Sequence, residues 1–491
     1  MTVCKLNAIQ QVLKLCLMIK HWFFFLLTLP LWLPAQTVTI SEDISLRNDI
    51  AYEILGRLKG QTLLFRDKSN EFEIQAFDER MRLSWSKELD LDKKRPEVIG
   101  LVPDKDRFTL LYAFRQKGDL IIKAHRYDPG ANMTDSATIK NLGYLIFSPK
   151  LEMIYSENRK KALVYYVERE TEYHAYMFDL DYMKLLWEGD LKLERFTFED
   201  DYEQLVVNDN GDVFVVLGRN NSWSKREDPR YEVHVFDGNS GQLRQFDVFF
   251  GEHLTYDAMF TYDNTHHQLV GAGLYSERNR ARAPGYFYLR IDPINPAAPD
   301  LQFHELDEEY VSNIMGKVND GSKGLAECVI QDIALRQDGG AVIIGERNRV
   351  YERRMSGPVR GFYDRTVARA IVDYYLDDLF ILSVHPDGTS HWQSICHKKQ
   401  YSQDDGAIFS SYLLAKTPRK LRLVFNDEIK NDNIVSEYLI GSNGNLDRNA
   451  VMSTENQQLK LRFRDGVQIT GNEIIVPSER RNRLKLVLVH F

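Results

Sequence analysis

The sequence has little cysteine and little proline for its length, with four Cys and 15 Pro among 491 residues. So few cysteines exclude a small scaffold held together by disulfides, and so few prolines exclude a proline-rich linker protein. At 43% hydrophobic and 27% charged residues, the chain is also unlike intrinsically disordered proteins. The length suffices for one large closed β-architecture or for two to three smaller domains.

Positive charge is not in excess, because 63 Lys and Arg stand against 71 Asp and Glu, a formal charge of −8. Dedicated nucleic-acid binders usually carry a net basic domain, so no nucleic-acid partner is predicted. The motifs HExxH, G-x-S-x-G, G-x-G-x-x-G and the P-loop do not occur. The sequence therefore identifies no catalytic residue and no cofactor site.

Long hydrophobic runs are lacking too. Residues 1–36 contain three lysines and no carboxylate, and their apolar run, residues 22–33 (WFFFLLTLPLWL), is 12 residues long. A bilayer needs about 20, so residues 1–36 are predicted to be a secretory signal peptide that starts at Met1 or Met18. The alternative is an N-terminal anchor helix. Without these residues the charge is −11, and no later stretch reaches transmembrane length. We expect an exported protein of the periplasm, the cell surface or the medium.

A repeat of strand-like runs extends over the rest of the chain. Eight runs rich in β-branched and aromatic residues occupy 61–67, 107–115, 161–167, 212–219, 267–275, 340–347, 420–427 and 472–479. Seven of them are followed by a second strand that ends in a tight turn of Asp, Asn, Gly or Pro, such as Phe236-Asp237-Gly238.

The eighth unit lacks its outgoing strand, whereas an unassigned strand, residues 37–40, lies at the other end of the chain. This predicts an all-β fold, a β-propeller of eight four-stranded blades (alternatively seven), closed by the N-terminal strand in the C-terminal blade. The predicted domain covers 37–491, with insertions at about 308–326 and 348–374. Two unrelated β-sandwich domains are the other alternative.

Three tryptophans, Trp85, Trp187 and Trp392, follow their turns by five to eight residues on the predicted outermost strands. This pattern, clearest at 236–241 and 387–392 (DGTSHW), resembles the repeat of quinoprotein-like eight-bladed propellers. Over 377–427 the chain is similar to uncharacterised secreted propeller-type proteins of Bacteroidota. The resemblance implies a propeller fold and export and brings no function with it. A quinoprotein cofactor pocket is not visible in the sequence, so no cofactor is predicted.

The spacing of cysteine and histidine residues bears on disulfides and metal sites. Cys328 is placed on or before the innermost strand of one blade and Cys396 on its outermost strand, about 14 Å apart, whereas disulfides need Cα atoms within about 7 Å. Two buried free thiols are predicted. His391 and His397 lie about 20 Å apart along one strand, so no metal site is predicted. Residues 208–212 (NDNGD) are expected to form a hairpin turn.

Arginine gathers in the connections between the second and third strands (B and C) of blades 4, 5 and 6, at 220–230, 276–284 and 348–373. Guanidinium groups bind carboxylate, phosphate or sulfate in bidentate fashion, and aromatic rings stack on planar groups. The predicted binding residues are Arg278, Arg280, Arg282, Arg349, Arg353, Arg354, Arg360, Arg365, Tyr351 and Trp223. Alternatively, these arginines pair with the acidic segment 307–310 and other carboxylates in a solvated network.

Three hypotheses follow. The first is an exported, non-catalytic binding or assembly module at the cell envelope, whose arginine-rich face takes an anionic ligand or an acidic envelope protein. The second is a propeller-type enzyme acting on a carbohydrate or other polymer from an axial pocket, since the fold cannot decide between the two. The third is a structural spacer in a surface layer.

Overall fold

The computed structural model describes residues 36–69, 71–93, 95–193, 201–221, 228–277, 280–296, 298–316, 324–354, 370–429, 434–454 and 457–491. The chain divides into two units: Met1–Thr37 with His490–Phe491, and Val38–Val489. The predicted signal peptide, residues 1–36, lies outside the described residues except for Gln36. None of the described helices is both long and apolar enough to cross a membrane.

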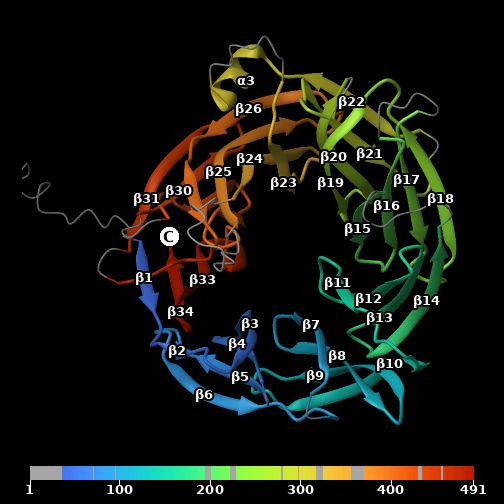
Figure 1. Cartoon of the computed structure of the whole chain (residues 1–491), viewed down its shortest axis with the longest axis vertical. Helices are drawn as coiled ribbons and strands as arrows, with labels where there is room; N and C mark the ends of the chain where they lie inside the picture. The colour runs from blue at the N-terminus through green and yellow to red at the C-terminus, as the bar shows by residue number, and fades with distance from the viewer. Residues whose placement is uncertain are drawn as a thin grey trace, which may run out of the picture. The chain divides into compact units, whose positions relative to one another are not determined.

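Within the described residues of Val38–Val489, eight antiparallel sheets follow one another around a ring, with the strands of each sheet lettered A to D from the axis outward (Figure 1). The fold is therefore a β-propeller of eight blades, as predicted. Blade 1 consists of β3 (Asp49–Leu58), β4 (Gln61–Lys68), β5 (Phe72–Phe77) and β6 (Leu83–Glu88), and blade 2 of β7 (Glu97–Pro103), β8 (Phe108–Gln116), β9 (Asp119–Tyr127) and β10 (Met133–Tyr144). Blade 3 consists of β11 (Glu152–Tyr155), β12 (Lys161–Glu168), β13 (Glu172–Asp179) and β14 (Lys184–Lys192). Blade 4 consists of β15 (Tyr202–Val207), β16 (Val213–Arg219), β17 (Arg230–Phe236) and β18 (Leu243–Phe249).

Blades 5–8 continue the same order. Blade 5 consists of β19 (Leu254–Asp263), β20 (Gln268–Ser276), β21 (Gly285–Ile291) and β22 (Asp300–Glu305). Blade 6 consists of β23 (Cys328–Leu335), β24 (Ala341–Arg354), β25 (Ala370–Val384) and β26 (Ser390–Cys396), and β27 (Gln400–Gln403) pairs with its β25. Blade 7 consists of β28 (Tyr412–Lys416), β29 (Lys420–Asn426), β30 (Ile434–Gly441) and β31 (Leu446–Ser453), and blade 8 of β32 (Val467–Thr470), β33 (Glu473–Arg480), β34 (Arg483–His490) and β1 (Thr37–Ile40).

The last blade joins the two ends of the repeat. Its order is β1-β34-β33-β32, and the short strand β2 (Ile44–Ser45) also pairs with β34. The Ser41 N–H donates to the Leu486 carbonyl at 2.9 Å, and the Leu486 N–H donates to Ser41 Oγ at 2.8 Å. The predicted closure by an N-terminal strand is confirmed. It occupies the outer edge of β34, which would otherwise present unpaired backbone groups.

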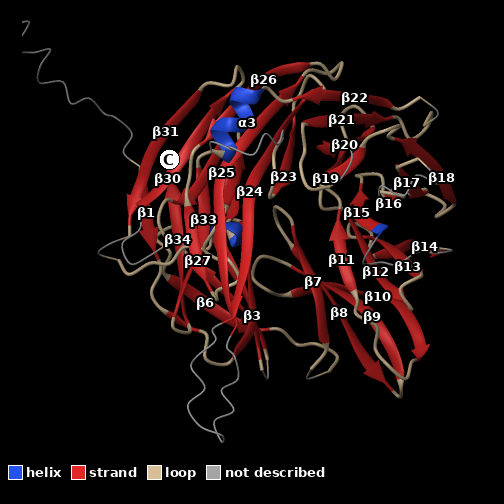
Figure 2. Cartoon of the chain, turned by 45° about the horizontal axis from the view of Figure 1, so that its top comes forward, coloured by secondary structure: helices blue, strands red, loops and turns tan. Residues whose placement is uncertain are grey.

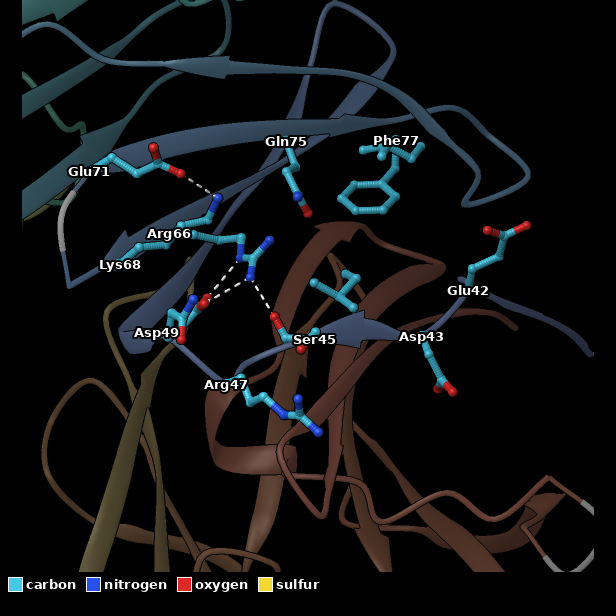
Figure 3. A pocket seen from close by; sticks show the side chains of 13 residues that line it. Glu42, Asp43, Ser45, Arg47, Asp49, Arg66, Lys68, Glu71, Gln75 and Phe77 are labelled. Carbon is cyan, nitrogen blue, oxygen red and sulfur yellow. Dashed lines mark hydrogen bonds and ion pairs between the residues drawn. The ribbon is translucent and has the colours of Figure 1, made fainter.

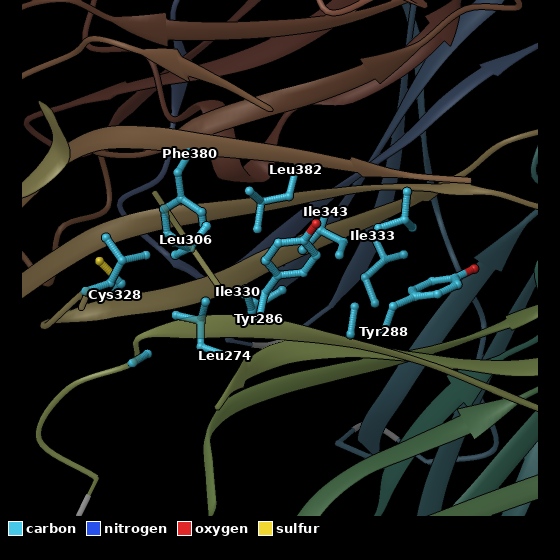
Figure 4. Close-up of a cluster of buried hydrophobic side chains, with 14 of the residues drawn as sticks. Leu274, Tyr286, Tyr288, Leu306, Cys328, Ile330, Ile333, Ile343, Phe380 and Leu382 are labelled. Carbon is cyan, nitrogen blue, oxygen red and sulfur yellow. The ribbon is translucent and has the colours of Figure 1, made fainter. Parts of the chain in front are cut away.

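The core lies between neighbouring blades. Strands rich in Val, Ile, Leu and aromatic residues bury side chains on both faces of each sheet, because every blade is packed between two others. Between blades 5 and 6 the buried side chains include Leu274, Tyr286, Ile330, Ile343 and Phe380 (Figure 4). Between blades 8 and 1, Leu64 and Phe77 pack with Ile475, Leu484 and Leu486, so the closing blade is fixed by apolar burial as well.

The turns follow the predicted pattern. Residues 208–212 connect β15 and β16, and Asn208 Oδ1 accepts the N–H groups of Asn210 and Asp212. Asp212 Oδ1 accepts the Gly238 N–H at 2.6 Å, so the A–B and C–D turns of blade 4 lie on one face of the ring. Trp85, Trp187 and Trp392 lie on D strands as expected, and Trp187 stacks on Phe236 with ring centroids 5.4 Å apart.

Both predicted free thiols are found. Cys328 begins strand A of blade 6 and Cys396 ends strand D, and both are buried and unpaired.

The two insertions contain regular structure. Helix α3 (Glu308–Met315) lies in the first, where the hydroxyl of Tyr310 donates to the carbonyls of Ser394 and Ile381 at 3.0 and 3.2 Å. In the second insertion, the prediction of a loop over 348–373 is wrong for the described residues. Strand β24 extends to Arg354 and β25 begins at Ala370 (Figure 2). Residues 348–354 pair with 370–376 across a β-hairpin. The ion pairs Arg349–Asp377 and Arg353–Asp373 connect the two strands.

Candidate functional site

The B–C hairpin of blade 6 is the candidate binding site nearest to the predicted one. Its two long strands, β24 and β25, extend beyond the blade, and β27 adds a third strand through pairs such as Asp373↔Gln403 and Tyr375↔Tyr401. We call this three-stranded part, residues 348–354, 370–376 and 400–403, the hairpin extension. It carries Arg349, Tyr351 and Arg353 of the predicted binding residues.

Arg353 forms an asymmetric ion pair with Asp373. Its Nε and Nη2 atoms face the two carboxylate oxygens of Asp373, and the Nη2–Oδ1 distance is 2.8 Å. The Arg353 side chain is 60% exposed, whereas that of Asp373 is 3% exposed. Asp373 also accepts from the Tyr401 hydroxyl at 2.8 Å and from Gln403 Nε2 at 3.2 Å, and the Arg353 guanidinium lowers the pKa of this carboxyl. The carboxylate is thus covered, while the guanidinium is held in one orientation toward solvent.

Arg349 is less exposed than Arg353 and contacts both a carboxylate and an aromatic ring. It is ion-paired with Asp377, the two side chains are 22% and 13% exposed, and its guanidinium lies 5.0 Å from the centre of the Tyr375 ring. Tyr351 is partly exposed, meets Tyr375 edge-on, and donates from its hydroxyl to Glu327 Oε1 at 3.0 Å. The alternative of carboxylate pairing therefore holds for Arg349 and Arg353. The acidic segment does not supply these carboxylates; its Asp307 accepts from Gln393 Nε2 at 3.0 Å.

A shallow cleft between blades 5 and 6 contains Arg280, which is exposed and lies near Asp257 and Glu327. Asp257 Oδ2 accepts the Ile330 N–H at 2.5 Å. Burial raises the pKa of Asp257, and burial raises that of Glu203 on β15 to about 7, with Arg280 opposing both shifts. Gly218 leaves room for Glu203, because a Cβ there would lie 2.7 Å from Glu203 Oε1. Arg282 approaches the Gly324 carbonyl at 3.4 Å. This cleft therefore has mixed charge.

Arg278, Arg360, Arg365 and Trp223 lie outside the described residues, as does the side chain of Arg354.

A cavity of about 670 Å³ lies at the inner strand of blade 1 and is completed by residues of blades 2, 3 and 8. Glu53 on β3 lines it in contact with solvent, and desolvation by the surrounding protein raises the pKa of Glu53 to about 7. On another wall, Arg462 pairs with Glu479 and Asp465, each at 2.5 Å. Sequence reasoning missed Glu53, because nothing distinguishes one carboxylate on an inner strand until the ring brings the strands together.

Among the described residues, one cluster of three side chains has ligand atoms close enough together to hold a metal cation. Ligand atoms of Glu168, Glu172 and His174, at the B–C hairpin of blade 3, lie within 4.8 Å of one another. Glu172 is already engaged by Lys192 at 2.7 Å and His174 by Asp190 at 2.6 Å. A cation would have to compete with both ion pairs. No cofactor-binding arrangement is assigned to the described residues.

No protein-family model matches the chain, and no curated protein matches it. Solved structures with a similar fold include the Dos1 propeller (8% identity, 92% of this chain and 94% of that chain, TM-score 0.42). Others are Porphyromonas gingivalis dipeptidyl peptidase 4 (10% identity, 89% and 58%, TM-score 0.43) and the β-propeller domain of the Trilobed protease from Pyrococcus furiosus (10%, 85% and 97%, TM-score 0.33). Similarity at this level supports no inference about activity, and the fold assignment rests on the strand order itself.

Proposed function

We propose that the protein is an exported binding or assembly module and that the hairpin extension is its docking surface for an acidic partner segment. A propeller fold suits a binding or assembly role in general. The signal-like residues 1–36 motivate export, and the partner is proposed to be another component of the cell envelope.

One observation carries the proposal, the unequal exposure of Arg353 and Asp373. A surface ion pair whose two members are equally solvated offers a partner little net attraction. Here the carboxylate is covered by Tyr401 and Gln403, and the guanidinium keeps outward N–H donors. A second carboxylate can bind these donors without displacing Asp373 and without ordering the arginine, so that little side-chain entropy is lost.

The test uses a labelled oligoglutamate peptide and the chain 37–491, with binding followed by fluorescence anisotropy at low and high salt. The variant Arg353→Gln should lower the affinity about fivefold to tenfold, because one charge-assisted hydrogen-bonding group is lost. The matched control is Arg448→Gln on β31, which removes an arginine that is 45% exposed and paired with Asp427 at 2.5 Å.

The control should leave binding unchanged. If both variants weaken binding equally, the peptide senses only net charge and the docking surface is rejected. The same rejection follows if wild-type protein does not retain the peptide at low salt, where electrostatic attraction is strongest.

A second candidate function rests on Glu53. Glu53 is exposed on the wall of the cavity, and a carboxyl whose pKa is raised to about 7 by the surrounding protein suits general acid–base catalysis at neutral pH. Arg462 and Tyr52 on the cavity wall could position a polar substrate. Turnover of a panel of glycans and other polymers by wild-type protein, abolished by Glu53→Gln and untouched by Arg353→Gln, would establish this function. Equal rates for wild type and Glu53→Gln would dismiss it.

A further inference from the structure

A groove of about 760 Å³ lies on blade 8, between the β33–β34 turn and the segment that leads from β2 to β3. We call it the closure groove. Its lining includes five cationic side chains and one carboxylate: Arg47, Arg480, Arg481, Arg483, Lys485 and Asp43. Serine, glutamine and asparagine residues complete the wall. The chain has more Asp and Glu than Lys and Arg, so a groove lined by five cations is unusual in it. A soluble surface does not need such a cluster of like charges.

Asp43 neutralises only part of this charge. Its oxygens lie 2.8 Å from Arg483 Nη1 and 3.7 Å from Lys485 Nζ. Among the described residues, no ion pair joins Arg47, Arg480 or Arg481 to a carboxylate, and all three are exposed. The groove therefore keeps a net positive charge, held by side chains that present several N–H donors to one space.

The backbone on both sides of the groove is fixed. Arg481 and Asn482 have φ values of 50° and 60°, the left-handed pair that makes a tight two-residue hairpin turn. The Leu46 N–H donates to the Asn482 carbonyl at 2.9 Å, and Ser45 pairs with Arg483. The connection that bears Arg47 is thus tied to the turn that bears Arg481. The groove exists only because the two ends of the repeat meet here.

A neighbouring cavity, which shares Asp43, Ser45 and Arg47 with the closure groove, contains Arg66. There, Arg66 donates to both oxygens of Asp49 at 2.7 and 2.8 Å and to the Ser45 carbonyl at 2.6 Å, so its charge is neutralised (Figure 3). Figure 3 also shows Arg47 pointing away from Arg66 and Asp49. Arg66 has a structural role at the junction of blades 8 and 1. Arg47 lines both this cavity and the closure groove, and no ion pair joins it to a carboxylate among the described residues.

We propose that the closure groove binds a compact polyvalent anion whose charges are phosphate or sulfate groups. Guanidinium groups match the oxygens of such tetrahedral anions, and several of them around one space favour a ligand with several charges. None of the described residues that line the groove is aromatic, so the rings of nucleobases have no surface on which to stack. None of these described lining residues has a large apolar side chain that would insert into a bilayer.

This site is separate from the hairpin extension and does not depend on the docking proposed there. Arg353→Gln should leave the closure groove unaffected, which keeps the two proposals distinguishable.

The test is isothermal titration calorimetry of the chain 37–491 with inorganic tripolyphosphate. One binding site per chain is expected, with an affinity that falls as salt rises. The variant carries Arg480→Gln and Arg481→Asn, since Asn tolerates the left-handed backbone at 481. The control carries Lys105→Gln and Arg419→Gln, two exposed residues in A–B turns, and therefore has the same net charge as the variant.

The groove variant should bind about tenfold or more weakly, because two of five cations are removed, and the control should bind like wild type. Equal loss in variant and control, or no heat with wild type at low salt, overturns the proposal. Circular dichroism checks that the variant keeps the fold. If it does not, the single variant Arg47→Gln, at a residue outside the strands, is titrated instead and should also bind tripolyphosphate more weakly than wild type. A sulfated disaccharide tested in parallel decides between phosphate and sulfate as the group preferred. Binding only to anionic vesicles would identify a lipid surface instead and would also overturn the proposal.

Discussion

The ammonium group of Lys398 lies 2.6 Å from Oε1 of Glu346, and neither side chain is accessible to solvent. Lys398 also donates to the Leu376 carbonyl at 2.8 Å and to Gln400 Oε1 at 3.0 Å. Glu346 Oε2 accepts from Ser411 Oγ at 2.9 Å and from Gln331 Nε2 at 3.1 Å. Burial lowers the pKa of Lys398, against the opposing effect of Glu346. This network connects strands A and B of blade 6 to β27 and to the segment before β28.

Removing one member of this pair should be far more damaging than removing both. Lys398→Met leaves the buried Glu346 carboxylate with Arg464, 3.9 Å from Oε2 and partly exposed, as its remaining cation. The expected cost is about 3–5 kcal/mol in the free energy of unfolding. The double variant Lys398→Met/Glu346→Gln should recover most of that loss, because glutamine keeps partners in Ser411 and Gln331. Urea denaturation measures both, and equal stability of the single and double variants would contradict the assignment.

Stability should fall with rising pH because of Glu203. Its folded pKa is raised to about 7 by burial, above the ordinary value of 4.5 for the unfolded chain. The stabilisation from the neutral form is therefore complete below about pH 4.5 and is lost as pH rises through 7. Glu203→Gln should flatten this part of the profile and gain about 1–3 kcal/mol at pH 8. Urea midpoints at pH 5, 6, 7 and 8 test this; parallel profiles for wild type and variant would refute it.

Ring closure should depend on the first strand. A chain that begins at Asp49 lacks β1 and β2, leaving the outer edge of β34 unpaired and Leu484 and Leu486 less covered. We expect a lower thermal midpoint and concentration-dependent association, since an open strand edge pairs with other chains. A synthetic peptide of residues 36–48 added in trans should raise the midpoint again. An unchanged midpoint for the shortened chain would show that closure contributes little.

The two thiols should be inert in the folded state. Burial raises the pKa of both Cys328 and Cys396 to about 12, so little thiolate exists at pH 8. Ellman's reagent should titrate no thiol in native chain 37–491 and two after denaturation. Fast reaction of either cysteine in native protein would mean that its blade opens locally.

The blades, their closure and the free thiols were predictable from the sequence, because each follows from local signals: alternating apolar residues, turn residues and one missing strand at the end of a repeat. The separation of Cys328 and Cys396 followed from strand order alone. The sequence places Arg349 and Arg353 in an arginine-rich connection and predicts a loop over 348–373. Only pairing with β25 and β27 shows that the chain remains extended there and that Asp373 and Asp377 are their partners.

The sites were decided by tertiary structure. Glu53 acquires its raised pKa from a ring of strands that are distant in sequence, and Lys398 meets Glu346 from 52 residues away. The basic run 480–485 is visible in the sequence. It becomes one wall of a groove only because the closed ring brings Asp43 and Arg47, from the other end of the repeat, next to it. Strand formation is a property of local sequence, whereas the charge balance of a cavity depends on which distant side chains the closed ring brings together.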